Sequence, residues 1–117
     1  MGLSMGLLNV AAALSGALSL AMLAYAHHAM AGEPGISSIY LAAGVQLAAA
    51  ASGLAIANRT GRLNLIAGSL IVGGATVFAA VIYLGAFDTH PLHMLAPLGG
   101  SAMIVGWITL AFTKPSA

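Results

Sequence analysis

Charged residues are nearly absent from this chain, which has three Lys or Arg and two Asp or Glu among 117 residues. Cysteine is absent altogether, which excludes disulfides, thiolate metal sites and cysteine nucleophiles. Soluble domains carry charge on roughly a quarter of their residues, whereas here the charged fraction is 4% and the mean hydropathy is +1.04. A net charge of +1 without a basic run excludes nucleic acid as a partner. The composition therefore predicts a membrane protein.

Short polar turns divide the sequence into four apolar stretches, each long enough to cross about 30 Å of hydrocarbon. Glycine and proline, which end helices, gather in these turns. The predicted spans cover residues 3–26, 36–57, 63–87 and 91–112. We therefore expect one all-α domain over residues 1–117, an antiparallel four-helix transmembrane bundle with short loops.

The first span also resembles a secretory signal peptide, because it ends in Ala24-Tyr25-Ala26. The run from Leu3 to Ala26 is longer than the usual apolar region of about 7–15 residues, and no Lys or Arg precedes it. We interpret it as an uncleaved span.

The charges predict the orientation of the bundle. Arg59, Arg62 and Lys114 fall in segments that share one side of the bilayer, whereas Glu33, Asp88 and all four histidines fall in segments on the other side. Positive residues concentrate in the cytoplasmic loops of membrane proteins. We therefore expect a multi-pass protein of the bacterial inner (plasma) membrane with both termini in the cytoplasm.

Four histidines form the first candidate site. His27 and His28 end the first span, and His90 and His93 open the fourth with the i, i+3 spacing that places two rings on one helical face. If the first and fourth spans are adjacent, these imidazoles predict an outward-facing site for a transition metal or haem. The alternative, that they are ordinary residues at a membrane–water interface, stays open.

The second candidate site is a position where two helices are expected to pack closely. Pro97 removes a helical hydrogen bond, so we expect a kink there, with Gly99 and Gly100 against a neighbouring helix. Such interrupted helices also form binding sites in transporters, but those proteins have repeated halves and this chain has no internal repeat. We further expect three polar side chains within the spans to face other helices rather than lipid; these are Asn9, Gln46 and Thr76.

A family resemblance extends over nearly the whole chain. It is carried by Pro97-x-Gly99-Gly100 followed by Gly106-Trp107, by Phe78 and Tyr83 in the third span, and by Ala24-Tyr25-Ala26-His27. On these residues the chain resembles the YgdD/YwdK family, small four-helix integral membrane proteins of unknown function. The resemblance implies that His27 matches a histidine typical of the end of the first helix in that family.

The chain departs from that family in two places. Val45-Gln46-Leu47-Ala48-Ala49 stands where members carry an aromatic-rich stretch with its own histidine, and Ala79-Ala80-Val81-Ile82 replaces a run of small residues. Any site that depends on the second histidine would be absent here. The resemblance thus implies fold and topology and leaves function open.

No nucleophile–base pair, buried carboxylate pair or phosphate-binding loop is recognisable, so we do not expect an enzyme. The sequence predicts a non-catalytic inner-membrane protein, an accessory or structural subunit of a larger respiratory or photosynthetic complex. Its expected partners are membrane lipids and other membrane subunits. The alternative is a small metal- or haem-binding membrane protein that uses the outer histidines.

Overall fold

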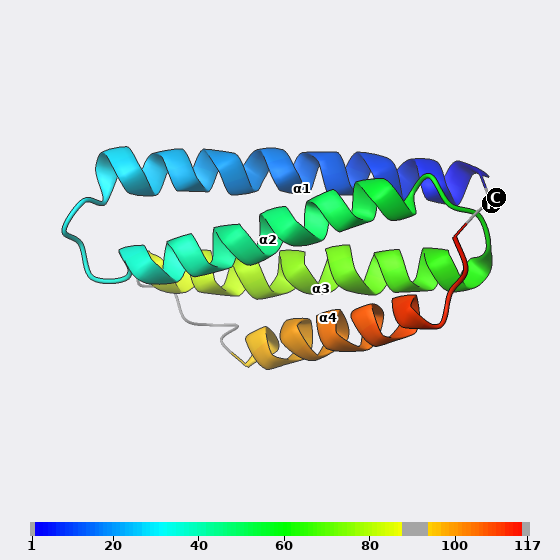
Figure 1. The fold of residues 1–117 in the computed structure, drawn as a ribbon. Helices are drawn as coiled ribbons and strands as arrows, with labels where there is room; N and C mark the ends of the chain where they lie inside the picture. Colours follow the sequence, from blue (N-terminus) through cyan, green and yellow to red (C-terminus); the bar gives the residue numbers. More distant parts are fainter. Residues whose placement is uncertain (1, 88–93, 116–117) are drawn as a thin grey trace.

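Four α-helices make up the part of the chain that the structure describes. The computed structural model describes residues 2–87 and 94–115, with side chains from residue 5 onward, and no strand occurs among these residues. The helices are α1 (Gly2–Ala29), α2 (Ile36–Ile56), α3 (Arg62–Ala86) and α4 (Leu95–Ala111) (Figure 1). The all-α prediction is confirmed.

The helix ends agree with the predicted spans to within one residue for α2 and α3. In contrast, α1 continues three residues beyond the predicted end at Ala26, and the turn that follows it contains Gly32 and Gly35, both with positive φ. Gly61, at φ 100°, occupies the N-cap of α3. Residues 91–93 of the predicted fourth span lie outside the described residues, and Met94 is the N-cap of α4.

Three of the described helices, α1, α2 and α3, are long and apolar enough to cross a membrane. The fourth, α4, is a shorter apolar helix of 17 residues. At 1.5 Å per residue it is about 26 Å long, slightly less than the roughly 30 Å of a hydrocarbon core. These lengths and compositions fit a membrane-embedded protein.

The helices lie lengthwise beside one another, and Figure 1 shows the chain alternating in direction from each helix to the next. The molecule measures 48 × 26 × 21 Å along its principal axes. Helices α1, α2 and α3 all contact one another, whereas α4 packs against α3 alone among the described helices. The fourth helix therefore flanks the unit that the other three described helices form.

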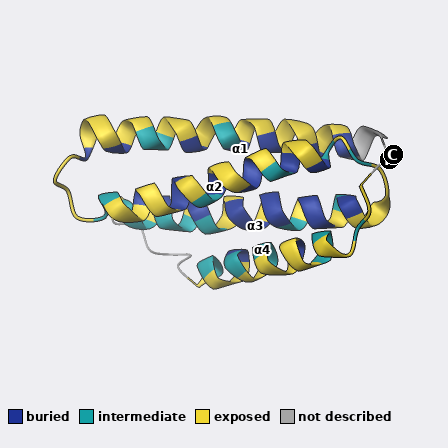
Figure 2. Cartoon of the chain, viewed as in Figure 1, coloured by how far each residue is buried: buried dark blue, intermediate teal, exposed yellow. Residues whose placement is uncertain are grey.

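Many large apolar side chains point outward, and alanines are frequent in the interior. Most of α1 is coloured as exposed in Figure 2, and α4 is a mixture of exposed and intermediate residues. Leu14 on α1 is 66% exposed and Ile104 on α4 is 62% exposed. Alanines fill much of the interior, including the fully buried Ala12 and Ala75. In water this distribution would expose apolar surface at a cost in free energy. In lipid, Leu and Ile can face the surroundings, and the association of helices then depends on the close packing of small residues. The burial pattern thus agrees with a bilayer environment.

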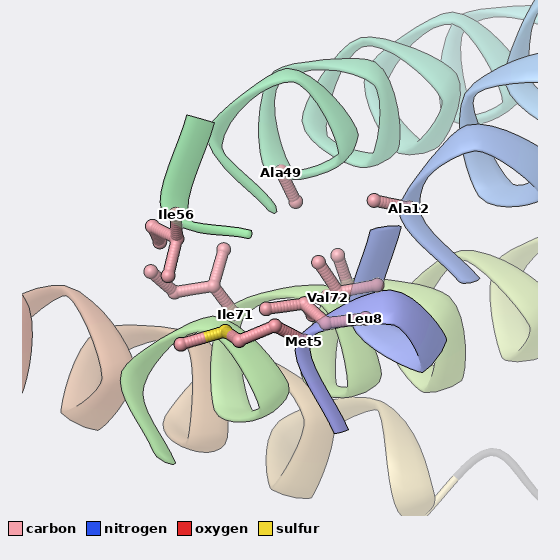
Figure 3. Packing of buried hydrophobic residues seen from close by; sticks show 8 residues of the cluster. Met5, Leu8, Ala12, Ala49, Ile56, Ile71 and Val72 are labelled. Carbon is pink, nitrogen blue, oxygen red and sulfur yellow. The ribbon is translucent and has the colours of Figure 1, made fainter. Parts of the chain in front are cut away.

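The interior holds two apolar clusters. One lies toward the α2–α3 turn and joins α1, α2 and α3; its labelled members in Figure 3 are Met5, Leu8, Ala12, Ala49, Ile56, Ile71 and Val72. The other lies toward the α1–α2 turn and includes Ala26, Ile39 and Tyr83. Close approach in the first cluster requires Gly68, where an added methyl group would lie 2.6 Å from Leu8 Cδ2.

Candidate functional site

Two of the four candidate histidines lie in the described part of the chain. His27 and His28 occupy the last turn of α1, both are exposed, and their ring centroids are 5.0 Å apart in an edge-on arrangement. His90 and His93 lie outside the described residues. Residues 2–87 and 94–115 contain no group of three or more His, Cys, Asp or Glu that could hold a metal ion.

The histidine hypothesis also requires the first and fourth helices to be adjacent. Among the described residues, α4 contacts α3 and makes no contact with α1. The packing therefore does not supply the α1–α4 contact on which a four-histidine site depends, and the metal or haem site stays a prediction.

Pro97 lies in the first turn of α4, as the third helical residue after the N-cap Met94. The first N–H groups of a helix have no acceptor within the helix, so proline removes no hydrogen bond at this position. Helix α4 is assigned without interruption from Leu95 to Ala111. Pro97 thus lies at the start of the helix, and the kink expected there stays a prediction.

The expected glycine contact is made by Gly99 and not by Gly100. A methyl group added at Gly99 would lie 2.6 Å from the carbonyl oxygen of Gly74 and 2.8 Å from the backbone nitrogen of Phe78, whereas one added at Gly100 meets nothing within 4 Å. Gly106 makes a second close approach, since a methyl group added there would lie 3.0 Å from the carbonyl oxygen of Ala67. Gly99 and Gly106 are seven residues apart and share a helical face, while Gly100 is turned about 100° away.

A buried polar cluster joins α1, α2 and α3. Gln46 on α2 is 1% exposed; its Nε2 donates to Ser15 Oγ at 2.9 Å, and its Oε1 accepts from the Tyr83 hydroxyl at 2.6 Å. Ser15 belongs to α1 and Tyr83 to α3, so one amide side chain fastens three helices. We refer to Ser15, Gln46, Thr76 and Tyr83 as the glutamine cluster.

The hydrogen bonds of the glutamine cluster run in one direction. Thr76 Oγ1 donates to the carbonyl oxygen of Val72 at 2.8 Å and lies 3.3 Å from Ser15 Oγ. Because the Thr76 hydrogen is used by Val72, the Ser15 hydroxyl donates to Thr76 while it accepts from Gln46. No buried side-chain nitrogen or oxygen among the described residues lacks a partner. The cluster therefore joins the three helices through a chain of hydrogen bonds that ends on a main-chain carbonyl.

The sequence identified part of this cluster. Gln46 and Thr76 were expected to face other helices, and both bond to Ser15. Ser15 and Tyr83 were missed as partners, because serines are frequent in this chain and pairing depends on how the helices are rotated. Asn9 was expected to face another helix, but its side chain is exposed and lines a surface hollow beside the α2–α3 turn.

A second polar network lies at the opposite end of the molecule from Glu33. Arg59 Nη1 donates to Asn64 Oδ1 at 3.3 Å and to Thr113 Oγ1 at 3.2 Å. Asn64 is buried, and its Nδ2 donates to the carbonyl oxygens of Thr60 at 2.9 Å and Lys114 at 3.2 Å. These bonds fasten the tail after α4 to the α2–α3 turn. We call the region of Arg59, Arg62 and Lys114 the basic end.

Comparison of the sequence with models of known families finds no match. Comparison with solved structures likewise finds none that is significantly similar. The resemblance to the YgdD/YwdK family therefore stays a prediction.

Proposed function

We propose that this chain is a non-catalytic, multi-pass protein of the bacterial inner membrane that acts as an accessory subunit of a larger respiratory or photosynthetic complex. In this proposal α4 is the fourth span of an antiparallel four-helix bundle of the YgdD/YwdK type, and both termini are cytoplasmic. The gathering of Arg59 and Lys114 at one end supports this orientation, since the hydrogen bonds of Arg59 and Asn64 hold the turn and the tail together.

The observation that carries the proposal is the open face of α3 between α1 and α4. A groove of about 550 Å³ runs between α1 and α3, and its lining includes Ala11, Ser69, Gly73 and Thr76. Small residues on an exposed helical face favour the close approach of another helix in lipid, where packing drives association. A transmembrane helix of a partner subunit is the occupant that fits such a groove.

Purification from the native membrane tests this proposal. The tagged chain, extracted in a mild detergent, should co-purify with a membrane subunit in a fixed ratio, measured by quantitative mass spectrometry. Ala11→Phe should fill the groove and reduce the recovered partner, whereas Ala13→Phe, at another exposed position of α1 that does not line the groove, should leave it unchanged. Equal recovery with both variants would contradict this docking face, and recovery of the chain alone would contradict the accessory role.

A further inference from the structure

The basic end concentrates positive charge, and no carboxylate side chain lies beside it among the described residues. Arg59, Arg62 and Lys114 are the only Lys or Arg residues of the chain. Among the described residues the one carboxylate side chain is Glu33, which lies in the turn between α1 and α2 at the far end of the molecule. Arg59 is held by the neutral oxygens of Asn64 and Thr113. The described contacts of Arg59 thus leave its positive charge without a counter-charge among them.

Two of these cations line one hollow. The hollow has a volume of about 360 Å³ and lies between the start of α3 and the tail after α4, with Arg62 and Lys114 in its lining. The bond from Asn64 Nδ2 to the carbonyl oxygen of Lys114 fixes the tail beside α3. This bond keeps the backbone of Lys114 close to the helix that carries Arg62, and both residues belong to the lining of the same hollow.

A separate apolar groove lies farther along α3. Leu63 lines the hollow, and Leu70 lines a groove of about 460 Å³ between α3 and α4. Seven residues are close to two helical turns, so Leu63 and Leu70 lie on one face about 10 Å apart along the axis. The same groove contains Gly73, where open space replaces a side chain. A charged hollow at the end of α3 and an apolar groove farther along the same helix follow the order of a phospholipid headgroup and its acyl chain.

We propose that the basic end binds an anionic phospholipid, with its phosphate between Arg62 and Lys114 and one acyl chain in the α3–α4 groove. Basic pockets between transmembrane helices recognise anionic headgroups, and each cation near the membrane surface contributes about fivefold to affinity. The site needs no partner subunit and is independent of which side of the membrane the basic end faces. It goes beyond the accessory role and does not depend on it.

Native mass spectrometry of the purified chain in an uncharged detergent tests the site. The probes are dioleoyl phosphatidylglycerol, dioleoyl phosphatidylcholine with the same acyl chains, and inorganic phosphate. We expect one phosphatidylglycerol to bind at least tenfold more tightly than phosphatidylcholine, and phosphate at equal concentration not to displace it. Equal binding of the two lipids would overturn the proposal. Displacement by phosphate would overturn it as well, because the ligand would then be a free anion.

Substitutions distinguish the contribution of the headgroup to binding from that of the acyl chain. Arg62→Gln combined with Lys114→Gln should weaken phosphatidylglycerol binding about 25-fold and leave phosphatidylcholine unchanged, whereas His27→Gln with His28→Gln, at the other end, should change neither. Gly73→Leu should weaken both lipids by filling the groove. Gly44→Leu, also in open space but outside the groove, is its matched control. Circular dichroism checks folding, and a phosphatidylglycerol preference that survives the double substitution would refute the site.

Discussion

At the scale of single residues, the glutamine cluster shows how a chain with few polar side chains uses them. Gln46 makes two hydrogen bonds, each with a partner on a different helix. Thr76 joins the cluster through its hydrogen bond with Ser15. A buried amide without partners costs several kcal/mol in hydrocarbon, so the rotation of all three helices is restricted to arrangements that pair it. The cluster therefore specifies helix register more than it adds net stability.

Replacing the central amide tests this role. Gln46→Leu should destabilise the chain by about 1–2 kcal/mol, because the Tyr83 hydroxyl and Ser15 lose their bonds to it. Tyr83→Phe should cost less, and the double variant should cost less than the sum of the two, since Gln46→Leu then leaves no tyrosine hydroxyl unpaired. Reversible unfolding in mixed detergent micelles measures these free energies. Strictly additive effects would contradict a direct bond between Gln46 and Tyr83.

At the scale of elements, α4 depends on α3 alone for its packing among the described helices. The contact uses backbone atoms, because Gly74 and Gly99 face each other with no side chain between them. Such close approach increases dispersion contacts where no hydrophobic effect between helices is available. The association of α4 with the other helices is consequently sensitive to a single methyl group.

Alanine substitutions at neighbouring glycines should have opposite effects. Gly99→Ala should destabilise the chain by about 1–3 kcal/mol, since the methyl group would meet the backbone of Gly74 and Phe78 and force α4 away from α3. Gly100→Ala should be neutral or stabilise by up to about 1 kcal/mol, because it meets open space and favours the helix. Thermal unfolding in detergent compares the two. If Gly100→Ala proved the more damaging variant, the assigned α3–α4 interface would be wrong.

At the scale of the whole molecule, charge separates the two ends. Arg59, Arg62 and Lys114 lie at the end that carries the α2–α3 turn, the start of α1 and the tail (Figure 1). The other end carries His27 and Glu33. The positive-inside rule applied to this separation predicts a cytoplasmic basic end.

Reporter fusions test the orientation. A fusion after Gly35 should report the periplasm, and a fusion after Gly61 should report the cytoplasm, because they follow turns at opposite ends of α2. Paired reporters, one active only in each compartment, exclude differences in expression. The reverse pattern would invert the proposed topology, and equal signals from the two positions would mean that α2 does not cross the membrane.

The sequence by itself determined the helices. Long apolar stretches interrupted by glycine and proline place α2 and α3 within one residue of their predicted bounds, since helix formation in an apolar chain depends on local length and composition. It also identified Gln46 as a buried polar contact, because an amide at that depth requires a partner.

Only the tertiary structure decided which helices touch and which side chains meet. Gly99 and Gly100 are adjacent and chemically identical, yet only Gly99 faces α3. Likewise, the position of α4 beside α3 and away from α1 cannot be read from four apolar stretches of similar composition. Helix rotation and neighbour choice arise from close packing summed over many weak contacts, and an Ala- and Gly-rich sequence allows many rotations with nearly equal local preference.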